Sequence, residues 1–168
     1  MNMSSSDKLE MTLNYVHHNP GEKRTESRYL DPCYLKALGF NGKVCNHHVQ
    51  AAVDFESIVP DLWVGNEDQR RWINSYAESI HADLKAAHDN GLLCLAWTDF
   101  IVFPKLLVDR YGEKILTDSA AETVFDVKGS VTPDIASEFT KVLLRAQIHE
   151  IFETFPELDG LVVRVGET

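Results

Sequence analysis

The chain has 168 residues, of which 44% are hydrophobic and 25% charged, and this ordinary globular composition predicts a single folded domain. Its 26 acidic residues outnumber its 16 basic residues, and the net charge of -10 disfavours nucleic acid or an anionic membrane surface as a partner. The length also excludes a complete (β/α)8 barrel, which needs about 200 residues or more.

The cysteines and the N-terminus indicate the compartment. Cys33, Cys45 and Cys94 show no C-x-x-C spacing, so neither a disulfide framework nor a zinc-finger site is expected, and a reducing, cytoplasmic location is favoured. The polar N-terminus lacks the apolar core of a signal peptide, and no apolar stretch reaches about 18 residues, so no membrane span is expected. We expect residues 1–11 to be a disordered lead and residues 12–168 to form the domain.

The first third of the chain contains two predicted strands and a short helix. Residues 13–17 read as a strand. Asp31 and Pro32 supply an N-cap and a first helical residue, and Gly39 ends the short helix that they open. Residues 43–47 are the second strand candidate.

The middle of the chain contains the clearest helix. Its apolar residues recur every three to four positions over residues 66–90: Ile73, Ala77, Ile80, Leu84 and Ala87. Asn90 and Gly91 supply its C-terminal cap. Residues 92–97 follow as a continuous apolar run, which predicts a strand buried on both faces.

Two further helices and a fourth strand complete the pattern. Residues 104–111 suggest a short helix that stops at Gly112, and Thr132 and Pro133 open a long one. The long helix is expected to bury one stripe: Leu144, Ile148, Ile151, Phe152 and Phe155. Residues 161–165 are the fourth strand.

Alternating strands and helices predict an α/β fold with a parallel sheet built from about four βα units. In such folds the chemistry collects at the carboxyl ends of the strands. The polar residues at those predicted ends are His17, His18, Asn46, His47, His48, Gln50, Thr98, Asp99, Arg164 and Glu167. The opposite ends carry turn residues instead, so one edge of the sheet is predicted to hold the site.

Each of these residues also has a simpler interpretation. A histidine at a strand end is often an exposed loop residue, and only one of two adjacent histidines can face inward. Asp99 can equally cap the next segment, and Trp97 can equally pack in the core. Arg164 lies inside an apolar strand, where its charge needs a carboxylate or a bound anion.

Four segments together resemble the N-terminal half of a glycoside-hydrolase-like TIM-barrel family of the alpha-glucuronidase type. They are residues 14–22, 39–44, 98–102 and 155–168, and the last is the most specific. The resemblance covers the chain from about Leu13 onward. It implies a parallel (β/α)4 half of a TIM barrel and a carbohydrate or uronic-acid-containing substrate.

The resemblance also implies site residues. In the large retaining clan of barrel glycosidases the general acid/base is a Glu at the end of strand four, which matches Glu167, although Gly166 replaces the usual Asn. The nucleophile of that clan comes from strand seven, so we expect the chain alone to be inactive. The residues expected to bind the substrate are His17, His47, His48, Trp97, Asp99 and Arg164.

Two other functions remain open. One is a hydrolase or isomerase that uses a divalent metal held by His17, His47, His48 and Asp99, whereas the leading interpretation requires no metal and no cofactor. The other is a non-catalytic sugar-binding or assembly module. A half-barrel leaves two sheet edges unpaired, so we expect a homo-oligomer or a dependence on a C-terminal half.

Overall fold

The chain folds around one parallel sheet of four strands. The computed structural model describes residues 10–15, 28–45, 47–116 and 133–164, so most of the predicted N-terminal lead lies outside it. The strands lie in the order β1-β2-β3-β4 and all pair in parallel. They are β1 (Leu13–Tyr15), β2 (Gly42–Cys45), β3 (Leu93–Asp99) and β4 (Gly160–Arg164). The predicted α/β fold with a parallel sheet is confirmed.

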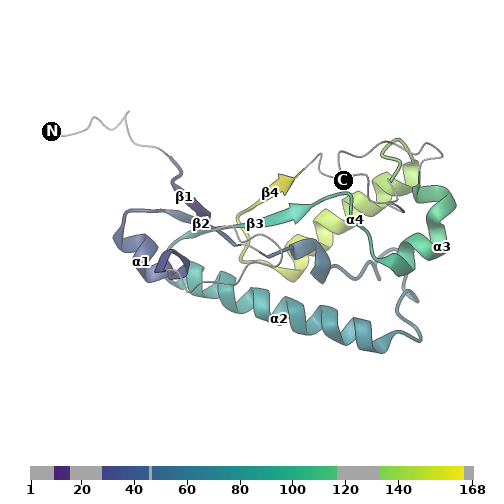
Figure 1. Ribbon diagram of the computed structural model, residues 1–168, viewed down its shortest axis with the longest axis horizontal. Coiled ribbons are helices and arrows are strands. Elements are labelled where there is room, and N and C mark those ends of the chain that lie inside the picture. The colour runs from purple at the N-terminus through teal and green to yellow at the C-terminus, as the bar shows by residue number, and fades with distance from the viewer. Residues whose placement is uncertain (1–9, 16–27, 46, 117–132, 165–168) are drawn as a thin grey trace.

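Four α-helices connect or flank the strands in the described part of the chain. They are α1 (Pro32–Ala37), α2 (Glu67–Asp89), α3 (Lys105–Ile115) and α4 (Glu138–Thr154), with 3-10 turns η2 (Arg28–Leu30) and η3 (Val49–Ala52). Figure 1 shows α2 along one side of the sheet, α1 near the amino ends of the strands and α3 beyond their carboxyl ends. None of the described helices combines the length and apolar character needed to cross a membrane.

The helix caps follow the sequence signals. The Asp31 side chain accepts a hydrogen bond from the Cys33 backbone N–H at 2.9 Å, so α1 begins where Asp31 and Pro32 predict. Gly91 follows α2 with a φ of 65°, a left-handed conformation that glycine adopts without steric cost. The end of α2 is therefore fixed locally.

Strand β3 is buried on one face only, so the prediction of burial on both faces is wrong. The residues that face the helices are fully buried: Cys94, Ala96 and Thr98. The alternate residues on the other face are half-buried: Leu93, Leu95 and Trp97. Their apolar character makes the run continuous in sequence, although α2 packs against β2 and β3 from one side (Figure 1).

The last two helices differ from their predicted limits. Helix α3 continues past Gly112 to Ile115, although Tyr111 departs from helical geometry with a φ of -128°. Helix α4 begins at Glu138 rather than at Pro133, and Pro133 forms an isolated bridge with Leu116. The predicted strand 43–47 is also shorter, since β2 ends at Cys45.

The buried face of α4 is rotated from the predicted stripe. Ile148 and Phe152 are 38% and 39% exposed. The face that enters the core mixes apolar and polar residues: Thr140, Leu143, Ala146, Gln147, Glu150 and Ile151. The spacing of hydrophobic residues does not predict this face, because Thr140, Gln147 and Glu150 are polar and yet buried.

Candidate functional site at the carboxyl edge of the sheet

Some of the predicted site residues lie in the part of the chain that the structure describes, and others do not. His17 and Glu167 lie outside the described residues. Arg164 is the last residue of β4, where its backbone pairs in register with Asp99 at the end of β3. Strands β3 and β4 therefore end side by side, at the edge where the sequence predicts the site.

His48 and Asp99 come together at this edge. His48 follows β2, and its Nδ1 lies 3.4 Å from Oδ2 of Asp99. Gln50 Nε2 lies 3.3 Å from the same His48 nitrogen, and the Thr98 hydroxyl donates to Gln50 Oε1 at 3.1 Å. We call His48, Gln50, Thr98 and Asp99 the edge cluster.

The proton on His48 decides which neighbour its Nδ1 binds. A protonated imidazole pairs electrostatically with the Asp99 carboxylate, whereas an unprotonated Nδ1 accepts a hydrogen bond from Gln50. The Asp99 side chain is only 12% exposed and the His48 side chain is 51% exposed. The cluster thus places an exposed imidazole next to a mostly buried carboxylate. The imidazole can donate a hydrogen bond to a hydroxyl group or accept one from it.

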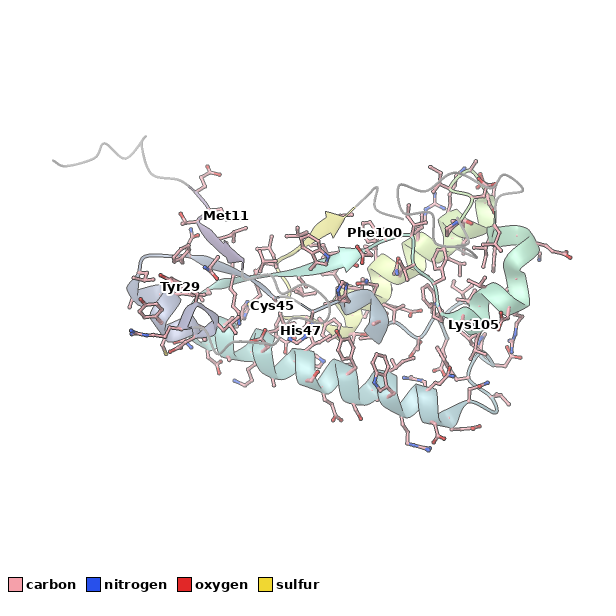
Figure 2. The ribbon with its side chains drawn as sticks, in the orientation of Figure 1. Met11, Tyr29, Cys45, His47, Phe100 and Lys105 are labelled. Atoms are coloured by element: carbon pink, nitrogen blue, oxygen red, sulfur yellow. The ribbon has the colours of Figure 1, made fainter. Side chains whose placement is uncertain are left out.

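His47 belongs to a different network, on the helix side of the sheet. Its Nε2 lies 3.5 Å from Asp83 Oδ2 on α2, and Lys43 Nζ lies 2.7 Å from Asp83 Oδ1. Figure 2 shows His47 between the sheet and α2, close to Cys45. The two adjacent histidines therefore belong to different networks, His47 with α2 and His48 with the edge cluster.

The ionisation of Asp83 is set by this network. Burial alone would raise the pKa of the Asp83 carboxyl, but hydrogen bonds from His47 and Lys43 outweigh it and hold the pKa well below its ordinary value. Burial, reinforced by the negative charge of Asp83, raises the pKa of the neighbouring Cys45 thiol far above its ordinary value. Asp83 is therefore a fixed anion that neutralises buried Lys43.

A pocket of about 370 Å³ lies next to the edge cluster, which contributes Gln50 to its wall. The pocket lies among η3, the first turns of α2 and the start of α3, whose first residue, Lys105, is labelled in Figure 2. Apolar side chains form most of its lining, and Gln50, Gln69 and Lys105 are the polar exceptions. A mostly apolar pocket with a few polar groups is the usual form of a small-molecule site.

Two tryptophans line this pocket. Trp72 on α2 is 56% exposed and stacks on Tyr76, with ring centroids 5.0 Å apart and an interplanar angle of 9°. Trp63 is buried, and its indole N–H donates to the Asp54 carbonyl at 2.8 Å. The stacking on Tyr76 and the hydrogen bond to Asp54 hold the two indole rings in place at the pocket.

A buried side chain of α4 binds the loop between η3 and α2. Glu150 of α4 is 8% exposed and accepts hydrogen bonds from the Phe55 backbone N–H, at 2.9 Å, and from the Ser57 hydroxyl. Phe55 has a φ of 58°, which is unusual for a residue with a side chain, and its ring is fully buried. The buried carboxylate thus holds the strained loop that carries Trp63.

Trp97 does not line this pocket. It lies on the sheet face that points away from α2, in register with Val162. Sequence reasoning therefore missed the tryptophans at the pocket, although a Trp on the otherwise polar surface of α2 was an available signal for Trp72. Trp63 offered no such signal, since a lone Trp in a loop is common in cores.

The histidines of the proposed metal set diverge, because His47 contacts Asp83 and His48 contacts Asp99. Among the described residues, three candidate metal ligands lie close together at the amino edge of the sheet instead. No protein-family model, curated protein or solved structure matches the chain.

Proposed function

We propose that the chain is a carbohydrate-active, glycoside-hydrolase-like protein that binds sugar at the edge cluster and the adjoining pocket. The observation that carries this proposal is the position of Gln50, which belongs to the hydrogen-bonded edge cluster and also lines the aromatic pocket. A sugar ring needs both kinds of surface, since its hydroxyl groups seek polar partners and its C–H face stacks on aromatic rings.

The chemistry of the described side chains fits this division. His48 and Gln50 offer donors and acceptors for hydroxyl groups, while exposed Trp72 offers a flat apolar surface. Lys105 lines the pocket with a side chain that is 84% exposed, and an ammonium group turned towards the pocket would favour a uronic carboxylate over a neutral sugar. Asp109 takes part of that charge, since its carboxylate lies 2.6 Å from Lys105 Nζ.

The fold proposal is a (β/α)4 half of a TIM barrel. Its support is the sequential order of four parallel strands, with α2 packed on one sheet face. In a barrel the opposite face lines the interior, which suits half-buried Leu93, Leu95 and Trp97. The outer edges of β1 and β4, which no described strand pairs with, would then meet a second copy or a C-terminal half.

The catalytic proposal rests on the resemblance alone. Glu167 follows β4 by three residues and would act as the general acid/base, with the second carboxylate supplied by the completing half. Retaining cleavage needs two carboxyl groups about 5–5.5 Å apart, and inverting cleavage needs about 6.5–9.5 Å. We therefore expect sugar binding by the chain, with negligible turnover.

Titration calorimetry with glucuronic acid and cellobiose tests the binding proposal. We expect tighter binding of glucuronic acid, and a loss of roughly tenfold in affinity for Trp72→Ala, since stacking on an aromatic ring contributes about 1 kcal/mol or more. Tyr29→Ala removes an exposed aromatic residue outside the pocket and is the matched control. Absence of binding to either sugar would overturn the proposal.

A turnover assay with aryl glycosides tests whether the chain is catalytic on its own. Binding without turnover fits the expected inactive half. Turnover that Glu167→Gln abolishes would instead establish catalysis by the chain alone and contradict the need for a second half.

A further inference from the structure

At the amino edge of the sheet, opposite the edge cluster, three elements bring together three different metal-binding groups. His88 lies in the last turn of α2, Cys94 is the second residue of β3, and Asp159 directly precedes β4. Their ligand atoms all lie within 4.8 Å of one another. Imidazole nitrogen, thiolate sulfur and carboxylate oxygen are the three ligand types that zinc takes in proteins.

The spacing of these atoms is close to that around a tetrahedral zinc ion. His88 Nε2 and Asp159 Oδ2 lie 3.4 Å apart. Zinc bonds of about 2.0–2.3 Å place tetrahedral ligands about 3.3–3.8 Å apart, so the three groups need movements of about 1 Å at most. Side-chain rotation supplies shifts of this size without a change in the backbone.

Backbone hydrogen bonds hold two of the groups in place. The Cys94 N–H donates to Asp159 Oδ2 at 2.8 Å, and the Asp159 N–H donates to the Cys94 carbonyl at 2.8 Å. A carboxylate oxygen that accepts one hydrogen bond keeps a second lone pair for a cation. The pairing of β3 and β4 thus orients the carboxylate before any ion binds.

The Cys94 thiol is buried and only weakly bonded. Its sulfur lies 3.5 Å from the Leu84 carbonyl and 3.7 Å from that of Leu92. Burial, with the nearby charge of Asp159, raises the pKa of this thiol to about 11. A divalent cation reverses that balance, because its charge stabilises the thiolate and the carboxylate together.

We propose that His88, Cys94 and Asp159 bind a zinc ion at the amino edge of the sheet. The side chains of His88 and Asp159 are 47% and 36% exposed, so a fourth ligand position faces solvent. The ion joins the end of α2 to the starts of β3 and β4, so it stabilises the folded chain by an amount that grows with the logarithm of the zinc concentration above Kd. This site is independent of the proposed sugar site.

Cobalt titration of the full chain tests the site, because thiolate-bound Co²⁺ gives an intense charge-transfer absorption that oxygen and nitrogen ligands do not give. The background variant is Cys33→Ser, since Cys33 is exposed and its thiol donates to Asn90 Oδ1, at the end of α2, at 2.9 Å. In this background we expect the absorption, its displacement by Zn²⁺, and a higher melting temperature with zinc.

Two histidine variants assign the ligand. His88→Gln should weaken Co²⁺ binding by about tenfold or more and remove the zinc-dependent rise in melting temperature. His149→Gln is the control, since its side chain is 71% exposed and pairs with Glu153 on α4. Asp159→Asn keeps an oxygen that can accept from Cys94 N–H but removes the charge, and it should weaken binding similarly.

Two results would overturn the proposal. One is the absence of charge-transfer absorption in the Cys33→Ser background, which would leave the His88–Asp159 contact as an ion pair only. The other is absorption that His88→Gln leaves unchanged, which would assign the cation to other groups.

Discussion

At the scale of single residues, the best-defined ionic group is Asp83. It neutralises Lys43, whose side chain is only 5% exposed, and it contacts His47. A lysine in the short strand β2 was a sequence signal that a carboxylate must lie nearby, because an unpaired buried charge is costly. Its partner was not predictable, since Asp83 is 40 residues away and its position depends on how α2 packs.

Asp83→Asn tests this network through pH. The folded-state pKa of Asp83 lies below its ordinary value of 3.8, so its charge adds stability above that pH and the contribution disappears as pH falls through the folded-state pKa. The substitution should cost about 1–3 kcal/mol near neutral pH, and the difference from wild type should shrink only as pH falls below 3.8 towards the folded-state pKa. Urea unfolding across this range measures it.

Asp68→Asn is the matched control, because the Asp68 side chain lies on the same helix and is 91% exposed. Its effect should stay within about 0.5 kcal/mol at all pH values. A difference between wild type and Asp83→Asn that does not change with pH would contradict the assignment.

At the scale of elements, β1 packs closely against β2 at Gly42. A Cβ at Gly42 would overlap Leu13 Cδ2 and lie 3.3 Å from both Cβ and O of Leu93. Gly42→Ala should therefore cost about 1–3 kcal/mol in the free energy of unfolding through overpacking. Denaturant unfolding measures this cost. A change in unfolding free energy near zero would show that β1 shifts away from the added Cβ without measurable cost.

Gly112→Ala is the same substitution at a position where an added Cβ overlaps no other atom. A Cβ there would lie 3.5 Å from Leu116 Cδ1, an ordinary contact, and Gly112 is inside α3. Replacing it should stabilise the chain by about 0.5–1 kcal/mol, since alanine loses less backbone entropy in a helix. The opposite signs of the two variants separate packing from helix propensity.

Helices with strong local signals were predictable, and the orientation of α4 was not. The caps at Asp31 and Gly91 act within a few residues, so sequence alone fixes them. The buried face of α4 instead depends on Glu150, whose hydrogen bonds to Phe55 and Ser57 span more than 90 residues of chain. A long-range polar contact of this kind does not affect the spacing of hydrophobic residues in the sequence, so that spacing cannot predict it.

At the scale of the whole molecule, the sheet has one face packed on helices and another that carries half-buried apolar residues. We predict that two copies associate through this second face and through the edges of β1 and β4 that no described strand pairs with, because joining β4 of each copy to β1 of the other satisfies both edges at once. Light scattering should give a dimer. A monodisperse monomer would contradict this prediction and leave a C-terminal half as the partner that the half-barrel proposal requires.

Leu95→Asp should convert the dimer to a monomer, because Leu95 lies on that face in register with Val44 and Gly160. Val142→Asp, on an exposed position of α4, should leave the dimer intact. The parallel sheet was predictable from alternating elements, and the meeting of His48 and Asp99 at its carboxyl edge was predictable from the polar strand ends. The one-sided burial was not, because an apolar run looks the same whether its second face meets a helix or another chain.

Helix α2 carries residues of both proposed sites, Trp72 near its start and His88 near its end. At a rise of about 1.5 Å per residue these positions lie about 24 Å apart along one axis. A cation at one end and a sugar at the other therefore cannot touch. A rigid-body displacement of α2 would move both ends together and so couple the two sites.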